Sequence, residues 1–189
     1  MRIALYFGSF NPIHNGHLII ANHVLKHTNA EQVWFVVSPQ NPFKQSAGLL
    51  NEYQRLHLIN LAIEGEKNLK ASNIEFNLPK PSYTINTLVY LQEKYPEHDF
   101  VILMGSDSFQ NISKWKNADV ILKNYPLYIY RRPGFEITDT HRSNIKIVDA
   151  PLLQISATHI RELIKLGKSI RYLIPDIVME EILRAGYYR

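Results

Sequence analysis

The chain has 189 residues, no cysteine and a formal net charge of +4. This length suits one domain with a substantial core, and the missing cysteine excludes both a disulfide framework and thiol catalysis. The mild, scattered basic charge argues against a nucleic-acid-binding module, and no apolar run reaches the roughly 20 residues that a membrane span requires.

Short aliphatic runs alternate with stretches of helical spacing along the chain. In chain order we predict a strand over 2–6, a helix over 16–26, a strand over 33–37, a functional loop over 38–50, a helix capped by Asn51 that runs to Ala62, a strand over 71–76, a helix over 83–94, a strand over 100–104, a helix over 113–122, strands over 127–130 and 145–148, and helices over 156–166 and 175–184, the last stopped by Gly186. This alternation predicts an α/β fold, with a mostly parallel sheet and helices on both faces. We find no linker, repeat or secretory signal, and therefore expect residues 1–189 to form a single cytoplasmic domain.

Polar clusters follow Phe7, Met104 and Leu153. In open parallel sheets, ligands bind beyond the carboxyl ends of the strands, near the point where the strand order reverses. We expect the functional site where these clusters meet.

The junction between the first strand and the first helix has the chemistry of a phosphate-binding turn. It reads GSFNPIHNGH from Gly8 to His17. Gly8 and Gly16 let the backbone approach phosphate oxygens, and the start of the helix presents free amide groups. His14 and His17 can both point into one cavity and donate hydrogen bonds to phosphoryl oxygens, more strongly when protonated. Two histidines at this spacing also suit a metal site, but no third ligand with persuasive spacing is nearby.

A second anion-binding pattern lies far downstream, where the sequence reads ISATHIR from Ile155 to Arg161. Ser156 is a good N-cap, which leaves the next amides free to meet an anion. Thr158 adds a hydroxyl in the first turn, and Arg161 offers a planar, permanent charge. A capped helix with an arginine is also a common structural feature, so the functional interpretation depends on its pairing with the first junction.

The two patterns resemble the GxFxPxHxGH and ISSTxIR signatures of the HxGH nucleotidyltransferase superfamily. This resemblance implies a Rossmann-like dinucleotide fold and transfer of a nucleotidyl group from a nucleoside triphosphate. Asn11 stands where many members have aspartate, and it keeps a carbonyl acceptor that shapes the loop. Ala157 replaces the commoner serine, so one hydroxyl contact is lost.

The middle of the chain resembles nicotinate mononucleotide adenylyltransferases in particular. The matching segments are PSYTINTL at 81–88, MGSDS at 104–108 followed by Trp115, RPG at 132–134 and YLIP at 172–175. The loop NPFK at 41–44 is a looser match that keeps Lys44. Lys116 departs from the aromatic pair often found beside the tryptophan in that family.

The resemblance implies roles for named residues of this chain. The ATP-binding residues would be Gly8, Ser9, Phe10, Gly16, Arg132, Ser156 and Thr158, and the catalytic residues His14, His17 and Arg161. In the mononucleotide pocket, Lys44 would meet the phosphate, Thr84 would bond the nucleotide, Asp107 would accept from a ribose hydroxyl, and Trp115 would stack on the pyridine ring in front of a helix that opens near Ser113. The alternative is that Trp115 and Tyr83 are only core aromatics.

The implied reaction is in-line attack by the phosphate of nicotinate mononucleotide on the α-phosphorus of ATP, with pyrophosphate leaving and no protein nucleophile. Mg²⁺ would be bound mainly through the ATP phosphates, with no metal site built from the protein alone. ATP and nicotinate mononucleotide are the expected partners, and the sequence leaves a homo-oligomer open. The rival functions are phosphopantetheine or nicotinamide mononucleotide adenylyl transfer and, outside enzymes, nucleic-acid binding.

Overall fold

The structure is a computed structural model that describes residues 1–39, 48–137, 144–151 and 153–189. Six strands form one sheet in the order β3-β2-β1-β4-β5-β6, and every neighbouring pair is parallel. The strands are β1 (Arg2–Gly8), β2 (Gln32–Val37), β3 (Leu69–Ser72), β4 (Asp99–Gly105), β5 (Leu127–Tyr130) and β6 (Ile145–Val148). The expected α/β fold with a parallel sheet is confirmed.

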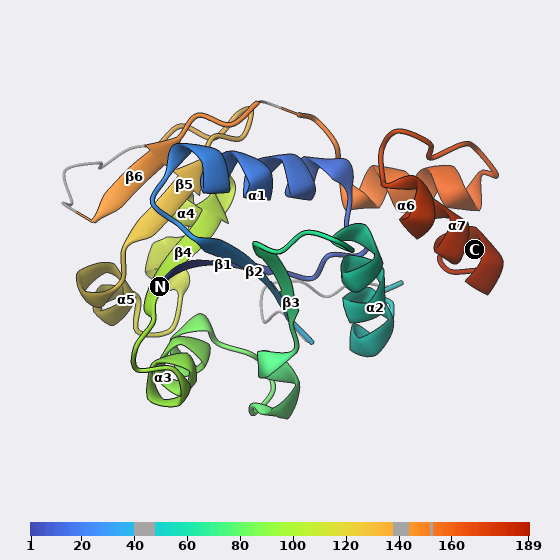
Figure 1. The fold of residues 1–189 in the computed structure, drawn as a ribbon. Helices are drawn as coiled ribbons and strands as arrows, with labels where there is room; N and C mark the ends of the chain where they lie inside the picture. The colour runs from blue at the N-terminus through green and yellow to red at the C-terminus, as the bar shows by residue number, and fades with distance from the viewer. Residues whose placement is uncertain (40–47, 138–143, 152) are drawn as a thin grey trace.

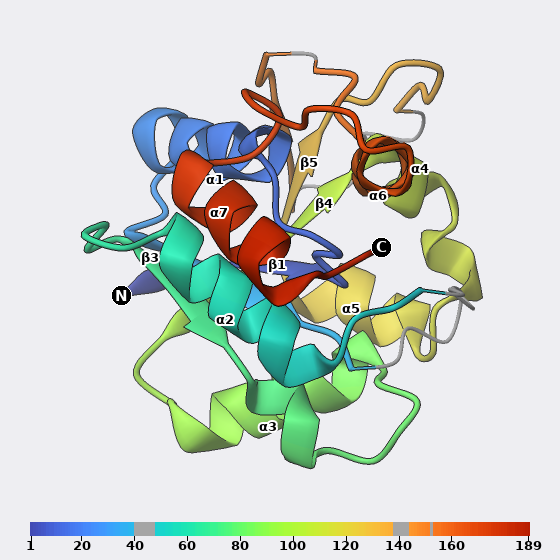
Figure 2. The same ribbon diagram turned by 90° about the vertical axis from the view of Figure 1, so that its right-hand side faces the viewer.

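Helices cover both faces of the sheet (Figures 1 and 2). The α-helices are α1 (Asn15–His27), α2 (Glu52–Ala62), α3 (Thr84–Lys94), α4 (Ser106–Gln110), α5 (Ala118–Asn124), α6 (Ala157–Lys165) and α7 (Asp176–Ala185), and the 3₁₀ turns are η1 (Ile74–Asn77) and η2 (Ile112–Lys114). None of the helices in the described residues is long and apolar enough to cross a membrane.

Side chains that alternate along the strands divide the core into two layers. Ala4 and Tyr6 of β1 belong to the layer that also contains buried residues of α1, α2, α6 and α7. Ile3 and Leu5 belong to the opposite layer, with buried residues of α3, α4 and α5. Burial on both faces explains why β1 is a nearly continuous aliphatic run.

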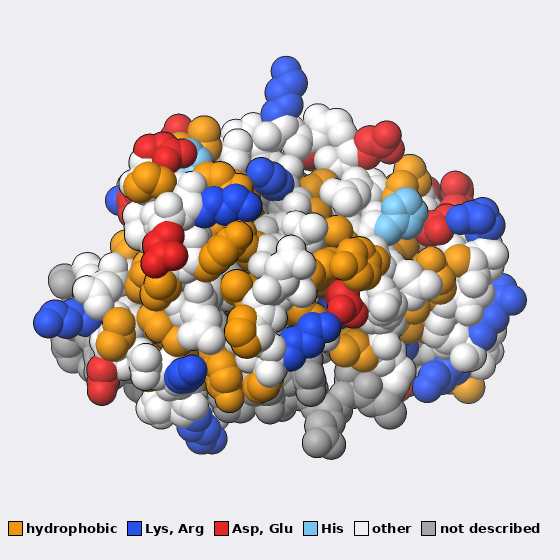
Figure 3. Space-filling model, turned by 90° about the horizontal axis from the view of Figure 1, so that it is seen from below, with side chains coloured by type: hydrophobic (Ala, Val, Ile, Leu, Met, Phe, Trp, Pro, Cys, Tyr) orange, Lys and Arg blue, Asp and Glu red, His pale blue; other side chains and the backbone are white. Residues whose placement is uncertain are grey.

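The surface on the side of α3 is mixed in character. Figure 3 shows apolar side chains spread over it, with Lys and Arg dispersed among them rather than gathered. Val89 and Tyr90 of α3 and Val120 of α5 are among the exposed large apolar residues of the molecule. The visible face therefore lacks the basic patch that a nucleic-acid-binding module would need.

Two predicted elements differ from the structure. The strand expected over 71–76 ends at Ser72, and the chain then turns into η1, which carries the Glu75 side chain into the interior. The helix expected over 113–122 is divided, because η2 ends at Lys114 and α5 begins only at Ala118, after Asn117 adopts a left-handed backbone with φ of 54°. The end of α7 agrees with prediction, since Gly186 caps it with φ of 68°.

The sheet order places β1 beside β4 in the middle of the sheet. From β1 the chain proceeds to β2 on one side, whereas from β4 it proceeds to β5 on the other. The carboxyl ends of β1 and β4 therefore form the switch point at which such sheets bind ligands.

Candidate active site

The turn after β1 is tightly folded. Phe10 has a positive φ of 46°, and its ring lies over Gly8, where an added Cβ would come within 2.9 Å of the ring. A Cβ at Gly16 would come within 3.0 Å of Nδ1 of His14. A side chain at Gly8 would require the Phe10 ring to shift, and one at Gly16 would require a smaller movement of the His14 ring.

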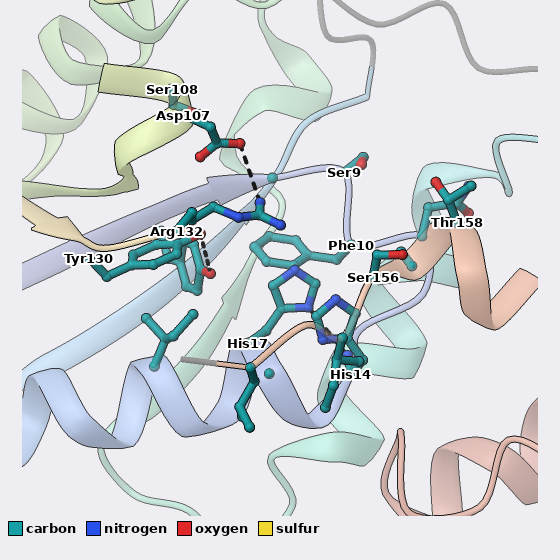
Figure 4. A pocket seen from close by; sticks show the side chains of 18 of the residues that line it. Ser9, Phe10, His14, His17, Asp107, Ser108, Tyr130, Arg132, Ser156 and Thr158 are labelled. Carbon is teal, nitrogen blue, oxygen red and sulfur yellow. Dashed lines mark hydrogen bonds and ion pairs between the residues drawn. The ribbon is translucent and has the colours of Figure 1, made fainter. Parts of the chain in front are cut away.

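The two histidines of this turn lie side by side in the cavity (Figure 4). Their rings stack with centroids 3.6 Å apart and planes 20° from parallel. Nδ1 of His17 accepts a hydrogen bond from the backbone N–H of His14 at 3.3 Å, and its ring meets Phe10 edge-on with centroids 5.0 Å apart. Because Nδ1 is an acceptor, the neutral imidazole of His17 carries its proton on Nε2, the nitrogen able to donate.

His14 is only 6% exposed, and this burial determines its charge. Removal from water, with a smaller contribution from the positive charge of Arg132, lowers the pKa of His14 to about 4. Its Nδ1 is buried without a hydrogen-bond partner among the described residues. His14 is therefore a neutral imidazole at pH 7 and lacks the stronger donation that protonation would give.

A direct hydrogen bond joins the two junctions that the sequence predicts to bind anions. Nη1 of Arg161 donates to the backbone carbonyl of Asn11 at 2.7 Å, and Nη2 donates to Oγ1 of Thr158 at 3.3 Å. Oγ of Ser156 accepts from the backbone N–H of His159 at 3.1 Å, which confirms it as the N-cap of α6. Residues 150 positions apart thus meet at the mouth of one cavity.

The Asn11 side chain uses both ends of its amide. Its Oδ1 accepts from the backbone N–H of Leu50 at 3.1 Å and from the Tyr188 hydroxyl at 2.8 Å. Its Nδ2 donates to the carbonyl of Gly48 at 3.1 Å. An aspartate could not make the donor contact, so the asparagine is matched to this loop, in agreement with its expected shaping role.

Arg55 of α2 is a buried cation that the sequence interpretation missed. Its guanidinium donates to the carbonyls of Ser9 at 2.6 Å, Ser38 at 3.0 Å, Leu50 at 2.8 Å and Pro39 at 3.4 Å. Burial lowers the pKa of Arg55. The side chain therefore ties the turn after β1 to the segment after β2 and to the residue before the N-cap of α2.

An ion pair lies where β4 and β5 end (Figure 4). Nη1 of Arg132 is 3.3 Å from Oδ2 of Asp107, and the backbone N–H of Arg132 donates to Oγ of Ser106 at 2.9 Å. A Cβ at Gly105 would come within 2.9 Å of Cδ of Arg132, so this position also requires glycine. Asp107 and Arg132 are held together on the floor of the site.

Two cavities adjoin at this end of the sheet. The first, of about 730 Å³, is lined by all ten residues expected to bind ATP or act in catalysis: Gly8, Ser9, Phe10, His14, Gly16, His17, Arg132, Ser156, Thr158 and Arg161. The second, of about 570 Å³, is lined by three of the four residues expected to bind the mononucleotide: Thr84, Asp107 and Trp115. The fourth, Lys44, lies outside the described residues. The cavities share a floor formed by Tyr6, Phe7, Gly8, Ser9, Ser38, Asp107, Ser108 and Tyr130.

The second cavity is aromatic, and its lining includes two lysines, Lys114 and Lys116, and two carboxylates, Glu75 and Asp107. Trp115 and Tyr83 pack against the apolar core while also lining the cavity, so their core role and a binding role are compatible. Nζ of Lys116 lies 4.8 Å from the centre of the Tyr83 ring. Ser113 is exposed in η2, and the expected helix opening at this residue is wrong.

Comparisons with known proteins show the family and the fold of this chain. Residues 5–163 match the family described as cytidylyltransferase-like. A probable nicotinate-nucleotide adenylyltransferase of Cytophaga hutchinsonii is 50% identical over 100% of this chain and 98% of that protein, and one of Flavobacterium psychrophilum is 48% identical over 100% of both. The fold is shared with the structure of Plasmodium falciparum nicotinic acid mononucleotide adenylyltransferase complexed with NaAD, with a TM-score of 0.85 over 99% of this chain and 97% of that one at 19% identity.

Proposed function

Because the chain belongs to the nicotinate-nucleotide adenylyltransferase family of cytidylyltransferase-like proteins, we propose that it joins the AMP part of ATP to nicotinate mononucleotide and releases pyrophosphate. The observation that carries this proposal is the hydrogen bond from Arg161 to Asn11, which unites two distant helix starts around one cavity. The product would be nicotinate adenine dinucleotide.

The triphosphate of ATP would occupy the first cavity. The guanidinium groups of Arg132 and Arg161 supply positive charge there, while Asp107 is the one carboxylate among the described lining residues. Gly8 and Gly16 leave room for phosphate oxygens, and the hydroxyls of Ser156 and Thr158 lie at the start of α6. Ser9 and Phe10 complete the turn that faces this group.

The chemical step needs no protein nucleophile. Both reacting groups are anions, so the protein must hold them close and neutralise oxygens as charge moves to the leaving pyrophosphate. We assign this task to Nε2 of His17 and the guanidinium of Arg161. His14, which is neutral and buried beside His17, would bind the triphosphate through its imidazole.

The mononucleotide would occupy the second cavity, with its phosphate over the shared floor and therefore next to the α-phosphorus. Trp115 would stack on the pyridine ring, Thr84 would bond the nucleotide, and Asp107 would accept from a ribose hydroxyl. Lys44 keeps its proposed role with the phosphate, on the strength of the resemblance alone.

The cations of the second cavity favour nicotinate over nicotinamide. The pyridine ring carries a carboxylate in nicotinate mononucleotide and a neutral amide in nicotinamide mononucleotide. Nζ of Lys114 donates a hydrogen bond to Oδ1 of Asn111 at 2.8 Å. Nζ of Lys116 lies over the Tyr83 ring and forms no ion pair with a carboxylate among the described residues. Lys116 is therefore the side chain whose charge would select the anionic ring.

Magnesium would enter with ATP. In the part of the chain that the structure describes, no group of three or more His, Cys, Asp or Glu side chains could hold a metal ion. Asp107 is available near the first cavity but is shared with Arg132. This small number of protein oxygens is compatible with a magnesium ion held mainly by phosphate oxygens and water. When bound, the ion would neutralise charge on the triphosphate. We further propose that the enzyme works in the cytoplasm and acts on these nucleotides rather than on nucleic acid or membranes.

The test is a pyrophosphate-release assay with ATP, magnesium and either nicotinate or nicotinamide mononucleotide, with the dinucleotide product identified by mass spectrometry. We expect nicotinate adenine dinucleotide to form, with a higher kcat/KM than for the amide. Release of pyrophosphate with neither mononucleotide would contradict the proposed function.

A further inference from the structure

Glu75 of η1 is the one carboxylate among the described residues that is buried, at 1% exposure. Its Oε1 accepts a hydrogen bond from Oγ1 of Thr87 at 2.8 Å, and Thr87 is itself fully buried in the first part of α3. The same hydroxyl is 3.5 Å from the carbonyl of Tyr83, so its single proton goes to the carboxylate. A buried carboxylate with this placement ties η1 to α3.

Other hydroxyls surround the same carboxylate. Burial raises the pKa of Glu75, and the hydroxyls of Thr87, Ser38 and Ser82 act in the opposite direction by stabilising its charged form. Ser38 follows β2, and Ser82 lies two residues before the start of α3. Glu75 therefore interacts with the end of β2, with the segment before α3 and with α3 itself.

Glu75 and Ser82 both belong to the wall of the second cavity. Oε2 of Glu75 and Oγ of Ser82 are both buried, and neither makes a hydrogen bond of normal geometry within the described residues. The buried carboxylate is thus placed to support the part of this wall that begins at Ser82.

The residues that follow Ser82 form part of the wall of the mononucleotide cavity. Tyr83 and Thr84 line the second cavity but not the first, and Tyr83 also supports Lys116. We infer that Glu75 is a positioning residue that holds segment 82–84 in place, so that Tyr83 and Thr84 are preorganised for the mononucleotide. This inference rests on the proposed function for the identity of the ligand.

Arg55 provides the contrasting case on the other face of the sheet. It is also fully buried, but it holds the carbonyls of Ser9 and Ser38 next to the ATP turn rather than segment 82–84. Loss of Glu75 contacts should therefore affect the mononucleotide selectively, whereas a change at Arg55 should affect ATP.

The experiment uses a matched pair at Thr87, which lines neither cavity. Thr87→Val keeps the shape of the side chain but removes the hydroxyl, whereas Thr87→Ser keeps the hydroxyl. In steady-state assays of the full chain we expect Thr87→Val and Glu75→Ala to raise the KM for nicotinate mononucleotide about tenfold, with the KM for ATP changed less than about twofold and Thr87→Ser close to wild type. An unchanged mononucleotide KM in Thr87→Val and Glu75→Ala, or an equal rise in both KM values, would overturn the inference.

Hydrogen exchange read by mass spectrometry gives a second measurement that does not depend on activity. In Glu75→Gln, which keeps the size of the side chain, amides of segment 82–87 should exchange faster than in wild type while those of 8–17 keep their rates. Equal rates at 82–87 would overturn the positioning role even if the alanine variant fails to fold. If wild type releases no pyrophosphate with either mononucleotide, the proposed function fails, and the exchange rates still decide whether Glu75 orders this segment.

Discussion

At the scale of single residues, His14 shows how burial sets the chemistry of the site. Its pKa of about 4 in the folded protein lies below the ordinary value of 6.5. As the pH falls below 6.5, His14 therefore becomes protonated in the unfolded chain but stays neutral in the folded chain. The stability contributed by neutral His14 is complete above pH 6.5 and is lost as the pH falls toward 4.

The lowered pKa of His14 predicts that the unfolding free energy depends on pH through this side chain. Between pH 7.5 and pH 5, wild type should lose about 2 kcal/mol of unfolding free energy relative to His14→Gln, which cannot titrate. Urea unfolding of both proteins at the two pH values measures the difference. A constant gap between the two proteins would show that His14 is not held neutral by burial.

Lys116 offers a test of substrate choice at the same scale. Its ammonium group is exposed and lies over Tyr83 in the mononucleotide cavity. Since exposed ion pairs contribute about 0.2–1 kcal/mol, Lys116→Met should lower the preference for nicotinate over nicotinamide mononucleotide by up to about fivefold. The ratio of kcat/KM values for the two substrates measures this preference. Lys114→Met is the control, because that ammonium group already binds Asn111 and its loss should leave the ratio unchanged.

Single residues also mark the limit of sequence interpretation. His14, His17 and Arg161 could be predicted because their motifs are local, and the structure brings all three to one cavity. Arg55 and Glu75 could not, because charged residues are normally exposed and only the folded chain shows which carbonyls or hydroxyls compensate their burial.

At the scale of elements, the end of the chain supports the β1–α1 turn. Tyr188 follows α7, and its hydroxyl donates to Oδ1 of Asn11 at 2.8 Å. The hydroxyl is largely buried, which raises the pKa of Tyr188. The last segment of the fold is thereby attached to the first turn of the site.

Removal of this attachment should be measurable. We expect Tyr188→Phe to lower the unfolding free energy by about 1 kcal/mol and the melting temperature by about 2–4 °C, because Asn11 loses one donor. The KM for ATP should rise, since Asn11 also accepts from Arg161 through its carbonyl. Tyr187→Phe is the matched control, because no hydrogen bond of its hydroxyl occurs within the described residues. Equal effects of the two substitutions would remove Tyr188 from the support of this turn.

The strands over 127–130 and 145–148 were predictable in every residue. The first is an unbroken buried run, LYIY, and the second, IKIV, is apolar except for the exposed Lys146. The helix expected over 113–122 is confirmed over 118–122 but is interrupted before that, because Asn117 adopts a left-handed backbone and Trp115 lines the second cavity. Periodicity alone does not contain that information.

At the scale of the whole molecule, the parallel sheet places the starts of α1 and α6 and two cavities at one switch point. The sequence predicted the sheet, both motifs and their meeting place. It could not predict how the cavities share a floor, because Tyr6, Ser38 and Tyr130 come from the ends of three strands whose order is set only by folding.

The central claim is that His17 and Arg161 act on the same oxygens of one triphosphate, and a double-mutant cycle tests it most directly. We would measure kcat for ATP and nicotinate mononucleotide in wild type, His17→Ala, Arg161→Lys and the double variant. The account predicts that each single change lowers kcat much more than it weakens ATP binding. It also predicts that the loss of transition-state stabilisation in the double variant is smaller than the sum of the two single losses by about 0.5–3 kcal/mol. Losses that add to within about 0.5 kcal/mol would show two groups that act independently, and would contradict a single shared cradle.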